Sequence, residues 1–366
     1  ALVARETEVE DHRLAGRRLS QASNTTPVSL ELQRLLATFR DAGATHACLE
    51  VSSHALALKR VEEVDFDAAI FTNLSSDHLD FHKTSEEYFR AKAHLFALLT
   101  KASNAKKKKI AVLNADDAKA QPLKRTASGA RIILYGLSEK ADFRAVELET
   151  TLTGTQFTIN WKGKRLKADI SLVGEHNVYN ALGAAAAALG VGIPTDAVLS
   201  GLRDLACVPG RLELVAEGQS FTVLVDFAHT ASAISAVLEH LQRLPHGRII
   251  TVFGCGGDRD PTKRGPMGVA ACRSSDLVVV TSDNPRGENP LSIIADIEAG
   301  LKTAGLKNYK IQPDRAAAIQ EAVRLARFGD IVLVAGKGHE DSQILRDRTI
   351  VFDDREVARA ALRSLA

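Results

Sequence analysis

The chain has 366 residues, which is enough for two domains of ordinary size, each with its own hydrophobic core. Apolar residues make up 45% and charged residues 25% of the sequence, a composition typical of globular proteins and not of disordered chains. The 47 Lys and Arg residues nearly balance the 45 Asp and Glu residues, so neither a nucleic-acid-binding nor a membrane-surface protein is expected.

The four cysteines are scattered and form no CxxC pair. We therefore expect neither a disulfide framework nor a zinc site, and a reducing compartment, the cytoplasm, as the location. The longest apolar runs, such as ALGAAAAALGVGI, are too short to span a bilayer, and we expect no signal peptide at the start.

The first part of the chain alternates between strand-like and helical segments. Apolar runs rich in Val and Ile predict strands at 46–51, 68–73, 109–114 and 131–136. Between about 142 and 173, alternating residues around the turn sequence KGK predict an antiparallel hairpin. A helix of small residues, which can pack closely, is predicted from 177 onward.

A second series of strands and helices begins after Pro209 and Gly210, so we place a domain boundary between 208 and 209. Its predicted strands lie at 222–227, 248–254, 276–282 and 330–336. Strands that are apolar on both faces suit parallel sheets covered by helices. The sequence therefore predicts an α/β fold: a parallel sheet with an antiparallel patch in residues 1–208, and a doubly wound unit in residues 209–366.

A polar cluster follows each of the last four predicted strands, and the clusters read DFAHT, GCGGDRD, SDNPR and GKGHED. Because ligands bind beyond the carboxyl ends of strands in such sheets, four clusters on one sheet predict a binding site. Three glycines of the second cluster allow close approach of a ligand to the backbone, and basic residues in and after it offer charge for a phosphate or carboxylate. These residues are Gly254, Gly256, Gly257, Arg259, Lys263 and Arg264.

A lysine lies on the apolar face of a helix predicted to begin at Thr84. Thr84 and Glu87 have the spacing of a capping box. Lys92 then falls on the same face as Tyr88 and Phe96. The ordinary interpretation is that Lys92 extends its amine to the edge of the apolar surface.

The alternative for Lys92 is a metal site. Glu50 follows one predicted strand and His78 another, and together they offer an oxygen and a nitrogen to a divalent cation. A carbamylated Lys92 would add a carboxylate, whereas an unmodified ammonium beside Mg²⁺ would be unfavourable.

Two asparagines, Asn177 and Asn180, lie three residues apart at the start of a predicted helix. Both amides can therefore face one ligand, and amides suit the edge of a purine. The equally good alternative is that Asn177 caps the helix. No G-x-x-x-x-G-K-[ST] sequence occurs in the 366 residues, so no P-loop is expected in this chain.

Many of these strings, in order from about residue 24 to the end, together resemble the Mur ligases. They are EVSSH, FTNLSSDHLDFH, YFRAKAHLF, NADD, GEHNVYNALGA, PGRLE, VDFAHT, FGCGGDRD, DNPR, AGKGHE and FDDREVA. The resemblance implies a central ATPase domain, here 1–208, and a Rossmann-like C-terminal domain, here 209–366. It also implies an ATP- and Mg²⁺-dependent ligase that adds meso-2,6-diaminopimelate to UDP-MurNAc-L-Ala-D-Glu through an acyl phosphate in peptidoglycan synthesis. The implied partners are these small molecules only, and a monomer is expected.

The resemblance also implies roles for individual residues. Glu50, His78 and carbamylated Lys92 would form the catalytic metal site. Asn177, Asn180, Arg211 and Asp226 would contact ATP, and Thr25, Thr26, Ser52 and Arg60 would contact the UDP-muramoyl substrate. The incoming amino acid would be bound by Arg259, Asp283, Asn284, Arg286, Gly336 and Glu340.

Two features depart from the family pattern. Leu58 stands where relatives have a glutamine, which removes one polar contact on the nucleotide-sugar side. The family's N-terminal domain and P-loop would precede the first residue given, so we expect the chain to be a fragment that hydrolyses ATP inefficiently by itself.

Three alternatives remain open. One is a lysine-adding relative, although lysine would give Arg286 no carboxylate partner. Another is a ligase like folylpolyglutamate synthase, which DNPR and GKGHE disfavour. The third is an inactive remnant that binds the precursor or amino acid.

Overall fold

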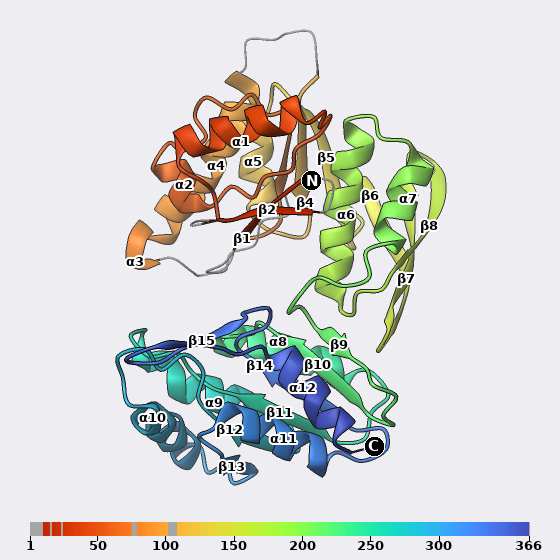
Figure 1. The fold of residues 1–366 in the computed structure, drawn as a ribbon. Coiled ribbons are helices and arrows are strands. Elements are labelled where there is room, and N and C mark those ends of the chain that lie inside the picture. The colour runs from red at the N-terminus through yellow and green to blue at the C-terminus, as the bar shows by residue number, and fades with distance from the viewer. Residues whose placement is uncertain (1–9, 15–16, 23–24, 75–78, 102–107, 366) are drawn as a thin grey trace. The chain divides into compact units, whose positions relative to one another are not determined.

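The computed structural model describes residues 10–14, 17–22, 25–74, 79–101 and 108–365. The chain divides into two compact units (Figure 1). The first comprises residues 1–147, 157–168 and 178–202, and the second comprises residues 148–156, 169–177 and 203–366. None of the described helices is long and apolar enough to cross a bilayer.

The first unit is built on a six-stranded sheet with the order β3-β4-β5-β6-β7-β8. The strands are β3 (Ala68–Phe71), β4 (Ile110–Asn114), β5 (Arg131–Gly136), β6 (Phe143–Thr151), β7 (Gly154–Trp161) and β8 (Lys164–Ile170). The pairs from β3 to β6 are parallel. Strands β7 and β8 are joined by Lys162 and Gly163, both with positive φ (50° and 75°), as in a type I′ hairpin turn. The predicted hairpin around KGK is therefore confirmed.

Helices pack on both faces of this sheet. The helices before residue 204 are α1 (Ser29–Asp41), α2 (Ser53–Ala57), α3 (Leu79–His82), α4 (Ser85–Lys101), α5 (Ala120–Thr126), α6 (Glu175–Gly190) and α7 (Thr195–Arg203). On one face, α4 and α5 bury Phe96 and Leu123 against Leu113. On the other, Gly183 of α6 lies so close to Tyr135 that a Cβ would be 3.3 Å from its ring. The small residues of α6 thus allow the close packing predicted for them. A separate antiparallel pair is formed by β1 (Glu10–Leu14) and β2 (Arg17–Ala22).

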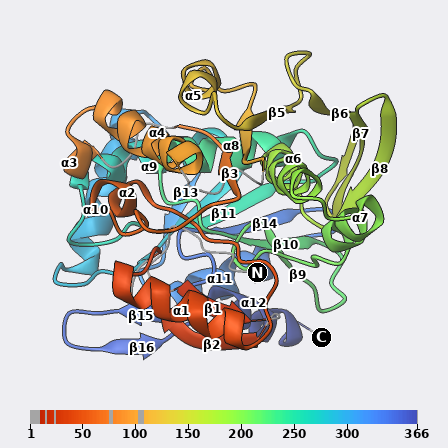
Figure 2. The same ribbon diagram turned by 90° about the horizontal axis from the view of Figure 1, so that it is seen from above.

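The second unit contains a six-stranded sheet with the order β13-β12-β11-β14-β10-β9. The strands are β9 (Glu213–Val215), β10 (Thr222–Asp226), β11 (Ile249–Phe253), β12 (Leu277–Val280), β13 (Tyr309–Ile311) and β14 (Ile331–Ala335). All neighbouring pairs are parallel except β9 with β10. The hairpin of β15 (Ser342–Ile344) and β16 (Thr349–Val351) forms a sheet of its own (Figure 2).

The core of the second unit has two layers, one on each face of the sheet. The helices are α8 (Ala231–Gln242), the 3-10 helix η1 (Pro261–Lys263), α9 (Arg264–Arg273), α10 (Pro290–Thr303), α11 (Arg315–Leu325) and α12 (Asp354–Arg363). Leu224 and Leu333 pack with α8, α9 and α10. Val223 and Val332, the preceding residues on the same two strands, pack with α11 and α12. Successive side chains of a strand point to opposite faces, so the sheet is covered on both sides, as predicted.

One predicted strand is absent: residues 46–51 are irregular and pair with none of the described strands. β3 is the edge strand of the described sheet, and backbone groups on either side of Val51 bond instead to a side chain. The Thr26 hydroxyl donates to the Glu50 carbonyl (2.9 Å) and accepts from the Ser52 amide (3.0 Å). The apolar pattern of this segment did not predict its structure correctly, because a strand forms only where a neighbouring strand offers backbone hydrogen-bond partners.

Candidate functional site

The four polar clusters follow β12, β11, β14 and β10, which are adjacent in the second sheet. These strands are mutually parallel, so their carboxyl ends meet at one edge. The prediction that the clusters lie together is confirmed. The loops after β12 and β14 carry five of the six residues predicted to bind an amino acid.

Asn284 connects those two loops. Its side-chain Nδ2 donates to Oε2 of Glu340 at 2.8 Å. Its Oδ1 accepts from Nζ of Lys337 at 2.9 Å and from the Ile344 amide at 3.0 Å. Asn284 is 2% exposed, so its amide is used for internal contacts and organises the site.

Glu340 and Lys337 form an ion pair with 2.5 Å between Oε2 and Nζ. Burial raises the pKa of the Glu340 carboxyl, and this effect outweighs the opposing attraction of Lys337. No hydrogen bond among the described residues involves Oε1 of Glu340. This second oxygen is therefore the one that can accept from a ligand.

Asp283 contributes a second carboxylate. Its Oδ1 accepts from the Asn284 amide at 2.6 Å, and its backbone carbonyl accepts from Nε2 of Gln343 at 2.6 Å. Gly336 has a φ of +115°, and a Cβ there would lie 2.9 Å from Oδ2 of Asp283. Gly336 thus contributes space, which explains why a glycine follows β14.

Arg286 has a left-handed backbone, with a φ of +50°, which is uncommon for a residue with a long side chain. Its amide donates to the Ile344 carbonyl and its guanidinium to the Gly257 carbonyl, both at 3.0 Å. A Cβ at Gly256 would lie 2.9 Å from NH1 of Arg286 and 3.8 Å from Cγ of Arg259. Gly256 therefore lies beside two arginines that follow different strands. Non-glycine residues with positive φ often mark functional sites.

Arg264 has a different role from the one predicted. Its guanidinium is 5% exposed and bonds to Glu288 at 2.7 Å and Asp296 at 2.8 Å. Those bonds raise the pKa of Arg264 further, the contact with Glu288 having the largest effect. Because both partners are carboxylates of the chain itself, Arg264 is a structural residue and is not available as a phosphate ligand.

Sequence patterns missed a buried pair beneath the site, Arg315 and Asp354. The Arg315 guanidinium also donates to the carbonyls of Ser282 (3.2 Å) and Ala335 (3.0 Å). Ser282 directly precedes Asp283, and Ala335 directly precedes Gly336. One cation therefore holds the starts of both loops. The sequence offered no signal for its partner beyond the string FDDREVA, in which Asp354 begins the C-terminal helix α12.

The residues predicted to contact ATP have mixed environments. Asp226 is buried, and its two carboxylate oxygens accept from the Leu212 and Ala228 amides, both at 2.8 Å. The Arg211 guanidinium lies 5.4 Å from the centre of the Phe227 ring. Asn177 is buried and donates to the Val173 carbonyl at 2.9 Å. Asn180, three residues further along α6, is exposed.

Three of the four residues predicted to contact the UDP-muramoyl substrate are joined by hydrogen bonds. Besides its bonds to the Glu50 and Ser52 backbone, Thr26 accepts at its carbonyl from the Arg60 guanidinium (2.9 Å). The Ser52 hydroxyl caps α2 by accepting from the Ala55 amide at 3.1 Å. Thr25 is half-buried next to Thr26.

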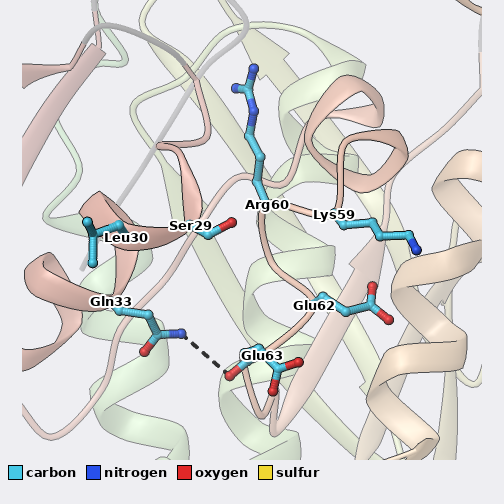
Figure 3. A pocket seen from close by; sticks show the side chains of 7 residues that line it. All are labelled: Ser29, Leu30, Gln33, Lys59, Arg60, Glu62 and Glu63. Atoms are coloured by element: carbon cyan, nitrogen blue, oxygen red, sulfur yellow. Dashed lines mark hydrogen bonds between the residues drawn. The ribbon is translucent and has the colours of Figure 1, made fainter.

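A pocket of about 300 Å³ adjoins this group (Figure 3). Basic and acidic side chains line it together with residues at the start of α1. Within the lining, Nε2 of Gln33 donates to the Glu63 carbonyl at 3.5 Å. The lining residues are Ser29, Leu30, Gln33, Lys59, Arg60, Glu62 and Glu63. Arg60 points away from the two glutamates (Figure 3). With mixed charge and no buried polar group directed into it, the pocket does not by itself identify a ligand.

The predicted metal set is described only in part, because His78 lies outside the described residues. Thr84 caps α4 as predicted, accepting from the Glu87 amide at 3.2 Å. Lys92 is half-buried on α4, with its Nζ 5.1 Å from the centre of the Tyr88 ring. Glu50 is half-buried in the irregular segment before α2. Within the described ranges, no three His, Cys, Asp or Glu side chains are grouped as metal ligands would be.

Comparison with known families agrees with the fold. The model of the Mur ligase middle domain matches residues 2–188, and that of the Mur ligase glutamate ligase domain matches residues 210–338. The chain belongs to the Mur ligase family.

Individual relatives are similar over most of the chain. UDP-N-acetylmuramoyl-L-alanyl-D-glutamate–2,6-diaminopimelate ligase of Solibacter usitatus is 46% identical, and the match covers 96% of this chain and 70% of the relative. The enzyme of the same name from Geobacillus kaustophilus is 45% identical, covering 96% and 72%. A solved structure of a ligase of that name superposes with a TM-score of 0.67 at 36% identity, covering 93% of this chain and 69% of the other.

Proposed function

We propose that the protein is an acid–amino-acid ligase that adds meso-2,6-diaminopimelate to UDP-MurNAc-L-Ala-D-Glu in peptidoglycan synthesis. The observation that carries the proposal is the charge arrangement at the carboxyl edge of the second sheet. Two arginines lie beside Gly256, and two carboxylates, Asp283 and Glu340, belong to loops connected by Asn284. Such a site is complementary to a zwitterionic amino-acid end.

The roles of these side chains follow from their charge. Arg286, with Arg259 beside it, would bind a carboxylate of diaminopimelate, and a guanidinium can do so with two parallel hydrogen bonds. Asp283 and the free oxygen of Glu340 would accept from the ammonium at that end. The amine at the other end of the molecule would then be left to react.

The reaction that this binding serves has two chemical steps. ATP transfers its γ-phosphoryl group to a carboxylate oxygen of the precursor's D-Glu, which gives an acyl phosphate and ADP. The free amine of diaminopimelate attacks the acyl carbon, an amide bond forms, and phosphate leaves with the C–O electron pair. The amine loses its proton in the same step.

Further residues are proposed as contacts for the other substrates. Thr25, Thr26, Ser52 and Arg60 would contact the UDP-muramoyl part, and three of them already form one hydrogen-bonded group. The proposed contacts for ATP are Asn177, Asn180, Arg211 and Asp226. Because Asp226 already accepts two backbone N–H groups, we propose that it acts by fixing the turn around Phe227.

Glu50, His78 and Lys92 would hold Mg²⁺, provided that Lys92 is carbamylated. As an ammonium beside the Tyr88 ring, unmodified Lys92 does not fit a cation site. When bound, Mg²⁺ would neutralise charge on the phosphate oxygens. We also propose the cytoplasm as the location, since Cys48, Cys255 and Cys272 are free thiols.

The experiment that tests the proposal is a phosphate-release assay on the protein in its natural full-length form. Release should require the precursor, diaminopimelate, ATP and Mg²⁺ together, and mass spectrometry should detect the tripeptide product. Release without the precursor would contradict the proposal, and binding of the precursor without any release would favour the inactive-remnant alternative.

A further inference from the structure

Lys337 has no exposed surface, although its ammonium is charged and lies in a glycine-containing loop. A buried charge is unfavourable unless it is paired and hydrogen-bonded. Lys337 meets this requirement with two side chains, donating to Oε2 of Glu340 at 2.5 Å and to Oδ1 of Asn284 at 2.9 Å. Those two are themselves joined, with 2.8 Å between Nδ2 of Asn284 and Oε2 of Glu340. The three side chains form a closed triangle, which we call the Lys337 triangle.

We propose that Lys337 is a positioning residue for the incoming amino acid, fixing Asn284 and Glu340 so that Oε1 of Glu340 is presented to the ligand's ammonium. This inference rests on the proposed function and adds to it a residue that would not itself touch the ligand.

The geometry of Asn284 supports this role. Its Oδ1 has two donors, the Lys337 ammonium and the Ile344 amide. Because Oδ1 faces two N–H donors, the Asn284 amide cannot be flipped to place its NH₂ group there. Nδ2 must therefore face Glu340. Glu340 then receives both of its hydrogen bonds on Oε2, and its rotation is restricted by two donors on different loops. Oε1 is left as the acceptor.

The charges around Glu340 add a second argument. Besides Lys337 on its own loop, Glu340 experiences Asp283 from the loop after β12 and Arg315 from α11. Burial and Asp283 raise the pKa of Glu340, and Lys337 opposes them. Without Lys337, a larger fraction of Glu340 would be protonated at a given pH. A neutral carboxyl would attract an ammonium less strongly.

The test is steady-state kinetics of the full-length protein with Lys337→Met, which keeps an unbranched side chain only one atom shorter and removes its charge. The KM for diaminopimelate should rise about 10- to 100-fold, as expected when a binding group is misplaced by about an ångström. The KM values for ATP and the precursor should stay within about twofold of the wild-type values, because Lys337 acts only on the loops after β12 and β14. The acidic limb of the pH profile of kcat/KM for diaminopimelate should move to higher pH.

The matched control is Lys310→Met, which removes an exposed lysine that also bonds to a glutamate, Glu321, at 3.0 Å. It should leave all three KM values unchanged. Circular dichroism melting of each variant reports whether it folds.

A double-mutant cycle keeps the proposal testable if Lys337→Met is unstable. Glu340→Gln should itself raise the KM for diaminopimelate, and adding Lys337→Met should cause no further rise, because Lys337 acts through Glu340. Additive losses, or equal losses for all substrates, would overturn the inference while leaving the proposed function standing. If the wild-type protein does not use diaminopimelate at all, the proposed function itself fails.

Discussion

Arg315 and Asp354 form a bidentate ion pair in which neither side chain has any exposed surface. Nε and NH2 of Arg315 lie 2.7 Å from Oδ1 and Oδ2 of Asp354, respectively. The pair joins the first residues of α11 and α12, while the same guanidinium holds the Ser282 and Ala335 carbonyls. The loops after β12 and β14, which carry most of the proposed amino-acid-binding residues, therefore start from backbone that is fixed by one buried charge.

Arg315→Met should destabilise the second unit by about 3–5 kcal/mol, since Asp354 would be left buried without its partner. Urea unfolding followed by circular dichroism measures this change. The control is Arg363→Met, because Arg363 also bonds to a glutamate, Glu217, through two nitrogens but is 68% exposed. That change should cost at most about 1 kcal/mol, as exposed ion pairs do. Equal losses in the two variants would show that burial of the first pair has no special effect.

Gly336→Ala should weaken the binding of diaminopimelate, because the new Cβ would lie 2.9 Å from the Asp283 carboxylate and displace it. Gly305→Ala serves as the control that separates this contact with Asp283 from the backbone strain of a non-glycine residue at positive φ. Gly305 also has a positive φ, +70°, but its Cβ would meet nothing within 4 Å. Both variants should lose stability, by about 1 kcal/mol or more, and the loss should be larger for Gly336→Ala because its φ lies further from the left-handed region that a non-glycine residue can adopt. Only Gly336→Ala should raise the KM for diaminopimelate, and a rise in both variants would assign the effect to strain.

Asp330 should make stability depend on pH. Its carboxylate, 4% exposed, accepts from the Arg248 guanidinium (2.7 Å) and from the Arg248 and Arg327 amides (2.8 and 2.9 Å). Burial acts to raise the pKa of Asp330, but the bonds from Arg248 and Arg327 outweigh it, so the pKa is lowered on folding. The resulting stabilisation is complete above the unfolded pKa of about 3.9 and is lost as the pH falls through the lower, folded value.

Asp330→Asn should therefore cost about 1.5–3 kcal/mol at neutral pH, the range for hydrogen bonds to charged groups. The difference from wild type should shrink below a pH of about 4, where the Asp330 carboxyl of the unfolded wild-type chain begins to be protonated while that of the folded protein is still ionised. Urea unfolding at a series of pH values measures this dependence. Asp169→Asn, at an exposed position, should change stability by less than about 0.5 kcal/mol at any pH. A constant difference between Asp330→Asn and wild type across the whole pH range would show that the charge of Asp330 is not responsible.

Much of this architecture could be predicted from local patterns. The strands of the second sheet are apolar on both faces, and the polar cluster after each of four strands indicated where the carboxyl edge would be. The turn at Lys162 and Gly163 was visible as KGK. Each of these features is encoded by residues close together in sequence.

The supporting residues could not be predicted in the same way. Lys337 lies in a glycine-containing loop and Arg315 at a helix start, and both positions usually expose a basic side chain. Their burial depends on Glu340, Asn284 and Asp354, and most of these contacts join segments far apart in the sequence. The strand predicted at 46–51 was wrong for a related reason: pairing depends on a neighbour, which an apolar run does not specify.

Arg286 provides the most direct test of the account, since it would bind the carboxylate that diaminopimelate has and lysine lacks. The measurement is the ratio of kcat/KM for diaminopimelate to that for lysine, in wild type and in Arg286→Ala. We predict a ratio of about 100 or more in wild type, the size expected when a paired charge is lost, falling to near one in the variant with little change in the KM for ATP. A wild-type ratio near one, or a ratio that Arg286→Ala leaves unchanged, would contradict the account.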